Sequence, residues 1–295
     1  MASHTILPSQ IPRGRRCLDD PVRERLIVID AIDEAGDAER NTLVELLARN
    51  AVRLPDWIGV VATSRSERAV TGPLQELNPY VMDTRTEANR ADLREYLRHA
   101  LHSQLQELPS AEYLVGKVIQ KSEGVFLYVE RFCDDVRNCY LSLAHPEQFP
   151  QGLGGIYFQW FKRQFPRVEV FRKGIRPALR AILASHEPLP VAILRRLFNW
   201  QDEEFRDFTG TLGSLFTVAS DGGPETIKPY HKSLTDWLTN EVKSGPYFVS
   251  AKEGQRLLSD FCRADYQKNP LHWSPYTLRY LAVYFRACPV SLSFA

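Results

Sequence analysis

The chain has 295 residues, of which 44% are hydrophobic and 25% are charged, values that exclude the collagen-like, low-complexity and wholly disordered classes. Its 37 Lys and Arg residues almost balance its 36 Asp and Glu residues, so the net charge of +1 gives no overall field that would attract nucleic acid or an anionic membrane. The length predicts about two or three domains with a core of their own.

The cysteines indicate a reducing compartment. They are odd in number, widely spaced and form no Cys-x-x-Cys pair, which is untypical of a disulfide framework or a zinc site. The first residues carry no apolar segment behind a basic start, so we expect no signal peptide. No apolar window approaches the ~20 residues that span a bilayer. We therefore expect a cytoplasmic chain without membrane contact.

Residues 1–24 are rich in breakers of regular structure. Pro8, Pro12, Pro21 and Gly14 interrupt them, and a run of basic residues lies around position 15. This composition predicts an extended leader with neither strand nor helix.

Residues 25–86 show the pattern of a parallel α/β sheet. The apolar run 26–29 predicts a parallel strand buried on both faces, and it ends at an acidic cluster. A helical pattern follows over 37–50, then a second strand over 57–62 that ends in Thr63-Ser64-Arg65. A short third strand is predicted over 80–82. Strand, helix and strand in this order are the unit of a doubly wound sheet.

Residues 87–150 change to a helical pattern, with helices expected over 91–101 and 111–120 and a break at 122–124. A long helix is expected from Gly124 to Tyr140, with Asp134 and Asp135 on its solvated side. Its apolar stripe consists of Phe126, Val129, Phe132, Cys133, Val136 and Tyr140. Prolines and glycines between 146 and 155 then predict a boundary or hinge.

Residues 151–245 predict a winged-helix domain. Three helices are expected over 176–185, 190–198 and 203–216, and a hairpin over 215–219 and 226–231, followed by an amphipathic helix through Leu234, Trp237 and Leu238. Residues 246–295 are helical in pattern and rich in aromatic residues, which predicts the start of a further helical arm. The expected fold class is therefore α/β followed by mostly α.

The end of the first strand has the form of a Walker B segment. An apolar strand in the middle of such a sheet delivers a carboxylate to a Mg²⁺ ion on the phosphates, and a following acid orients the attacking water. In this interpretation Asp30 binds the metal, and Asp33 or Glu34 orients the water. Arg65, at the end of the next strand, would contact a terminal phosphate through its guanidinium. The alternative is a buried strand followed by solvated acids that precede the next helix.

Together these residues resemble the STAND class of P-loop NTPases, and the NACHT group in particular. The resemblance rests on motif order over residues 25 to about 290. It includes the helical segment after Lys121, which lacks the usual Gly-x-Pro, the linker-like stretch 149–157, and the segment 228–238. It implies ATP or ADP with Mg²⁺ as cofactors, protein partners through self-association or repeat domains, and His231 as a contact to the β-phosphate of ADP. The alternative for His231 is a half-buried histidine that caps the following helix.

The phosphate-binding loop Gly-x-x-x-x-Gly-Lys-Ser/Thr is absent from the sequence. We therefore expect a fragment or a degenerate relative of a NACHT-type signalling ATPase, a nucleotide-controlled switch whose chain alone binds neither ATP nor ADP. An incomplete sheet of this kind should expose a strand edge and apolar surface.

Two other functions stay open. One is a scaffold that binds protein partners without nucleotide control. The other is a winged-helix DNA binder, which acids on both expected contact elements oppose: Asp202, Glu203, Glu204, Asp207, Asp221 and Glu225. We expect no nucleic acid among the partners.

Overall fold

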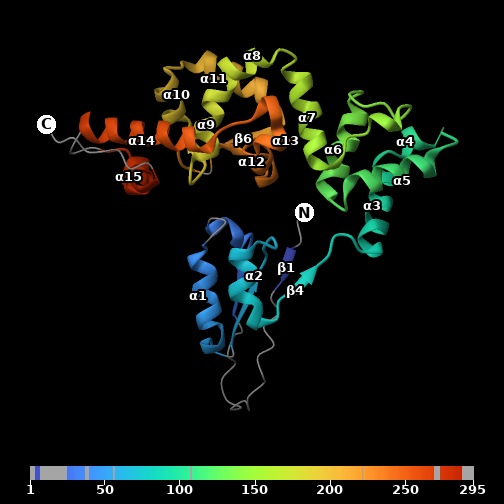
Figure 1. The fold of residues 1–295 in the computed structure, drawn as a ribbon, viewed down its shortest axis with the longest axis horizontal. Helices are drawn as coiled ribbons and strands as arrows, with labels where there is room; N and C mark the ends of the chain where they lie inside the picture. The colour runs from blue at the N-terminus through green and yellow to red at the C-terminus, as the bar shows by residue number, and fades with distance from the viewer. Residues whose placement is uncertain are drawn as a thin grey trace. The chain divides into compact units, whose positions relative to one another are not determined.

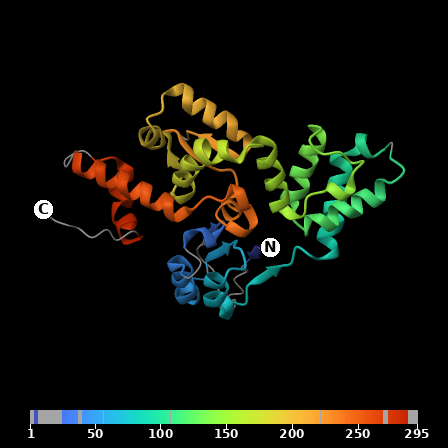
Figure 2. The ribbon, with the colours of Figure 1, turned by 45° about the horizontal axis from the view of Figure 1, so that its top comes forward.

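The computed structural model describes residues 4–6, 25–36, 40–55, 57–106, 108–220, 222–268 and 273–287. The chain divides into two units, residues 1–152 and 153–295. Figures 1 and 2 show its elements in chain order from blue to red. Most of the predicted leader 1–24 lies outside the described residues. Residues 4–6 do not fit that prediction, because they form a strand, β1 (His4–Ile6).

The first unit begins with two small sheets. Strands β2 (Arg25–Ile29) and β3 (Ile58–Ala62) are parallel, with Ile27 opposite Val60 and Ile29 opposite Ala62. The predicted third strand, β4 (Tyr80–Met82), also forms, but it pairs antiparallel with β1 instead of extending the parallel sheet. The two strands are far apart in the sequence, so no local sequence pattern indicates that they pair.

Two helices cover the parallel pair, α1 (Thr42–Asn50) and α2 (Arg68–Leu74), and they lie side by side in Figure 1. Helix α1 begins five residues later than its predicted range. Asn41 fixes its start, because the Asn41 Oδ1 accepts from the Val44 N–H at 3.0 Å while its Nδ2 donates to the Ile32 carbonyl at 2.7 Å. Short turns of 3₁₀ helix connect these elements: η1 (Ile32–Ala35), η2 (Ala51–Arg53) and η3 (Gln75–Leu77).

The prediction that the first strand is buried on both faces is wrong for this chain. Leu26, Ile27 and Val28 of β2 are 63%, 46% and 65% exposed. Among the described residues only β3 pairs with β2, so no neighbour covers its other edge. The apolar surface expected of an incomplete sheet is therefore present, while the small core beside it is closed: Ile32, Val44, Ala62, Val70 and Leu74.

The rest of the first unit is helical. It contains α3 (Glu87–Ala100), α4 (His102–Leu105), α5 (Ala111–Ser122), α6 (Phe126–Arg137) and the short η4 (Pro146–Gln148). The predicted break after α5 is confirmed, because Glu123 and Gly124 both have left-handed backbones, with φ of 55° and 82°. Gly124 is required there, since a Cβ at that position would lie 2.3 Å from the Thr84 carbonyl oxygen.

Helix α6 buries the middle of its predicted stripe but not the ends. Phe126 is 43% exposed and Tyr140 is 59% exposed, because the helix begins at the first and ends before the second. Tyr128 is buried in their place, and its hydroxyl donates to the Pro150 carbonyl at 2.7 Å. Asp135, predicted on the solvated side, is also buried.

The second unit is helical around a small antiparallel sheet. Its elements are α7 (Gly152–Gln164), α8 (Val168–Val170), the π-helical η5 (Phe171–Ile175), α9 (Arg176–Ala184), β5 (Leu189–Pro190), α10 (Val191–Phe198), α11 (Asp202–Leu212), η6 (Gly213–Leu215), β6 (Phe216–Ala219), β7 (Thr226–Pro229), α12 (Lys232–Leu238), α13 (Glu241–Ser244), η7 (Gly245–Tyr247), α14 (Ala251–Lys268) and α15 (Pro275–Ala287). The predicted hairpin is confirmed, and β5 joins it in the order β5-β7-β6. Helix α7 begins at Gly152, within the linker-like stretch 149–157.

One aromatic core fills this unit. Phe161 is fully buried, with its ring centroid 5.3 Å from that of Trp237 and 5.8 Å from that of Phe171. Buried side chains of α14 and α15, such as Leu258 and Tyr284, belong to the same cluster, so the core continues past residue 245. Helix α14 packs along α9. Within the described ranges, no helix combines the length and hydropathy that crossing a bilayer requires.

Candidate functional site

The carboxyl ends of β2 and β3 bring the predicted acidic edge together. Because Ile29 and Ala62 are paired, Asp30 and Thr63 follow at neighbouring positions. The Thr63 hydroxyl donates to the Asp30 carboxylate at 2.5 Å and accepts from the Ala31 N–H at 2.8 Å. Ala31 has a left-handed backbone, with φ of 51°, which is uncommon for a residue with a Cβ. The turn therefore presents Asp30 exposed, with one of its oxygens held by Thr63.

Asp33, unlike Asp30, is buried: it is only 3% exposed. Its Oδ1 accepts from the Ser64 hydroxyl at 3.4 Å and from the Arg65 N–H at 3.2 Å. Its Oδ2 lies 3.9 Å from the Arg65 Nε, and the Arg65 side chain is 19% exposed. Asp33 thus ties the Thr63–Arg65 segment to η1. Glu34, the next residue, is exposed.

For a divalent cation, the described residues of this edge offer single carboxylates and not a full set of protein ligands. Mg²⁺ usually takes one or two carboxylates and fills its remaining positions with waters and substrate phosphates. Asp30 can supply one such carboxylate. In the part of the chain that the structure describes, no group of three or more His, Cys, Asp or Glu residues could hold a metal by itself.

His231 lies in the second unit, at the N-cap of α12. Its Nδ1 accepts from the Ser233 N–H at 3.1 Å and lies 2.6 Å from the Ser233 hydroxyl. That hydroxyl is 2.8 Å from the Tyr157 hydroxyl, which is also 2.8 Å from the hydroxyl of Tyr230. The alternative predicted from sequence, a helix-capping histidine, is therefore present, although its ring is exposed and not half-buried.

The structure thus gathers four of the five predicted site residues in the first unit and leaves the fifth in the second. Sequence reasoning placed Thr63 and Ser64 at the end of the second strand but did not predict their hydrogen-bond partners. It missed Asn41, which ties η1 to α1. An Asn placed directly before an apolar helical pattern is a common N-cap and would have indicated it.

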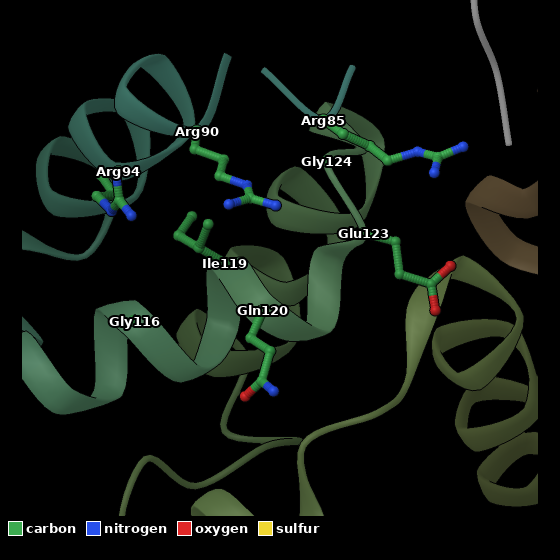
Figure 3. A pocket seen from close by; sticks show the side chains of 8 residues that line it. All are labelled: Arg85, Arg90, Arg94, Gly116, Ile119, Gln120, Glu123 and Gly124. Carbon is green, nitrogen blue, oxygen red and sulfur yellow. The ribbon is translucent and has the colours of Figure 1, made fainter. Parts of the chain in front are cut away.

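A pocket of about 380 Å³ lies between α3 and α5 in the first unit (Figure 3). In Figure 3 the Arg90 guanidinium extends over Ile119, whereas the Glu123 carboxylate points away from it. Glu123 accepts instead from the Gln151 side chain at 2.7 Å. The arginines of this pocket already have acidic partners: Glu87 for Arg90 and Arg94, at 3.7 and 2.5 Å, and Asp83 for Arg85, at 3.9 Å. We assign no ligand to it.

Two buried thiols are unsuited to nucleophilic chemistry. Burial raises the pKa of Cys133 to about 12 and that of Cys262 to about 11. Because the thiolate is the nucleophile, neither side chain is activated.

No known protein family, curated protein or solved structure matches this chain. The similarity to the NACHT group therefore depends on the sequence motifs.

Proposed function

We propose that the edge formed by Asp30, Glu34 and Arg65 is the magnesium side of a nucleotide site, and that the chain is part of a NACHT-type signalling switch. In this proposal residues 25–86 are a portion of a P-loop NTPase sheet, residues 151–245 form a winged helix, and residues 246–295 begin a further helical arm. The observation that supports it is the register of β2 and β3, which sets Asp30 beside the Thr-Ser-Arg segment at the carboxyl ends of parallel strands. Ligands of open α/β sheets bind at those ends.

Each residue then has a distinct task. Asp30, exposed and oriented by Thr63, would be a ligand of the Mg²⁺ ion that neutralises the phosphates. Asp33 has both oxygens engaged, so it positions Arg65 instead of meeting water. The exposed Glu34 is left to orient a water molecule. His231 would contact the β-phosphate of ADP and favour the resting state.

Without a phosphate loop the affinity should be very low. Several charge-assisted hydrogen bonds, each worth roughly 1.5 to 3 kcal/mol, are missing, and every 1.4 kcal/mol is about tenfold in affinity. We expect no ADP retained through purification of this chain and no measurable ATPase turnover.

The test must therefore detect weak binding. Mn²⁺ with ADP, added to isotope-labelled full chain, should broaden the amide signals of residues 30–34 and 63–65 by paramagnetic relaxation. The change Asp30→Asn should abolish that broadening. The control Asp83→Asn removes an equally charged, exposed carboxylate after β4 and should leave it intact. Broadening centred elsewhere, or unchanged in the Asp30→Asn variant, would overturn the proposal.

A second candidate function is a protein-interaction scaffold without nucleotide control. The exposed apolar side chains of β2 favour it, because contiguous apolar surface marks sites of association. The two functions separate in the same experiment, since a scaffold predicts no broadening near Asp30. DNA binding has no such support, because α11 begins with Asp202, Glu203 and Glu204.

A further inference from the structure

A row of arginines lies on the continuous helical stretch of the second unit. Arg172 in η5, then Arg176 and Arg180 in α9, follow one another at four-residue steps. At this spacing side chains are neighbours on one helical face. Such like-charged neighbours repel, so the row is destabilising unless something compensates it.

The surroundings of Arg176 disfavour its positive charge. Burial first, and then the charges of Arg180 and Arg172, hold the pKa of the Arg176 guanidinium below its usual range. Only the carboxylate of Glu253 opposes this effect. Arg176 stays protonated all the same, because an arginine in a protein does not lose its proton.

The Glu253 carboxylate already has a partner in the row. Helix α14 packs on α9 and brings Glu253 into an ion pair with Arg180. Arg172 and Arg176 make no ion pair with any described residue. The Nε atoms of Arg176 and Arg180 are buried and have no hydrogen-bond partner among the described residues. Buried polar atoms without a partner in a native structure call for an explanation, of which an absent ion is one.

The pocket arginines of the first unit are the natural contrast. Arg85, Arg90 and Arg94 each have a carboxylate within ion-pair distance. Among the described residues, the row on η5 and α9 has one ion pair for three arginines, so the imbalance belongs to this particular face and not to arginine-rich helices in general.

We propose that Arg172, Arg176 and Arg180 form a binding site for a phosphate group. The planar guanidinium fork matches the oxygens of a phosphate in pairs, and adjacent forks can share one dianion. The bound anion would compensate the repulsion within the row and supply acceptors for guanidinium N–H groups. The site lies outside the proposed nucleotide edge and does not depend on it.

Inorganic pyrophosphate is the probe, titrated calorimetrically into the full chain at fixed ionic strength. We expect saturable binding that Arg176→Gln weakens at least about tenfold, which is the loss of one charge-assisted interaction. The affinity of Arg176→Lys should lie between those of the parent chain and Arg176→Gln, because lysine keeps the charge but lacks the planar guanidinium fork. The control Arg206→Gln removes an exposed arginine from α11 and should leave the affinity unchanged.

A stability measurement separates this site from a purely structural arginine. Without anion, Arg176→Gln should melt no lower than the parent chain, since it removes a desolvated, repelled charge. With pyrophosphate, only the parent chain should gain in melting temperature. Equal gains in both chains, no saturable binding at millimolar pyrophosphate, or a large loss of stability in Arg176→Gln with and without anion would each overturn the proposal.

A second arm identifies where the phosphate comes from. Vesicles of phosphatidylcholine with phosphatidic acid are sedimented with the full chain, and free pyrophosphate is added as competitor. Binding of pyrophosphate alone indicates a soluble phosphate ligand. Co-sedimentation that is lost in Arg176→Gln indicates a lipid headgroup. Binding of neither contradicts the site.

Discussion

Strands β2 and β7 each carry an isoleucine near the middle of the strand, but in different surroundings. Strand β7 is the middle strand of its sheet, and Ile227 within it is fully buried. Strand β2 has one described partner, and its Ile27 is 46% exposed. The apolar residues of a strand thus show that burial would stabilise it. The number of neighbours that the tertiary structure supplies decides whether it receives that burial.

The same difference separates the two cores. The second unit closes a large aromatic cluster around Phe161, whereas the α/β part of the first unit closes only a small aliphatic one. Because stability grows with buried apolar area, substitutions should be far more costly in the second unit.

The largest effect is expected at Phe161. Replacing it with Ala removes a fully buried ring and should cost about 4 kcal/mol of unfolding free energy. Ile27→Ala in β2 should cost under about 1 kcal/mol, because much of that side chain is already in water. Urea unfolding of both variants measures the difference. Equal costs would mean that β2 is covered in solution.

Gly254 tests how closely α14 approaches α9. A Cβ at this position would lie 1.9 Å from the Arg180 carbonyl oxygen, so Gly254→Ala must push the helices apart. We expect a loss of about 2 to 3 kcal/mol in thermal unfolding. Gly210→Ala in α11 meets nothing within 4 Å and should gain up to about 1 kcal/mol from helix propensity. A harmless Gly254→Ala would show that the two helices are further apart.

The acidic edge offers a matched pair of carboxylates. Asp33→Ala removes the acceptor of the Arg65 N–H and the carboxylate beside the Arg65 Nε, although the Ser64 hydroxyl keeps the Arg65 carbonyl as an acceptor at 2.9 Å. We expect this change to cost about 2 kcal/mol. Asp30→Ala removes an exposed group and should cost under about 1 kcal/mol. Hydrogen exchange of the Arg65 amide reports the change locally. Faster exchange in Asp30→Ala than in Asp33→Ala would reverse the roles assigned to them.

Asp265 should make the second unit sensitive to acid. Burial alone would raise its pKa, but hydrogen bonds from Ser274, Thr277 and Arg196 outweigh burial and lower it. A lowered pKa in the folded state stabilises above the unfolded value, about 3.9, and the contribution is lost as pH falls through the folded value. The urea midpoint should therefore drop more between pH 6 and pH 3 in the parent chain than in Asp265→Asn. Equal drops would assign the acid sensitivity to other carboxylates.

The smallest effect on stability is expected from Val28→Lys, although it should alter association. Val28 is 65% exposed on a strand without a second described partner, and a lysine on such an edge opposes pairing between chains. Light scattering should show less aggregation, with unfolding changed by under about 0.5 kcal/mol. Leu46→Lys, at an exposed site on α1, is the control and should leave aggregation as it was. An unchanged aggregate fraction in Val28→Lys would exclude β2 as its cause.

Sequence periodicity was sufficient to place most elements of this chain. The 2-residue and 3.6-residue patterns are local, so β2, β3, β4 and most of the predicted helices form near their predicted positions. The order of strand, helix and strand also implied that Asp30 and Arg65 follow neighbouring parallel strands, and the register confirms it. The position of each strand and helix depends on side chains that are only a few residues apart.

Tertiary contacts decided the rest, because they join residues that no local pattern links. Thr63 reaches Asp30 and Ser64 reaches Asp33 across more than thirty positions, which divides two similar acids into an exposed one and a buried one. Strand β1 pairs with β4 over a still longer separation. The arginine row of η5 and α9 became notable only when α14 supplied an ion pair to one of its three arginines. The exposure of a side chain and the charge balance around it depend on which residues pack against it, and only the folded structure determines that.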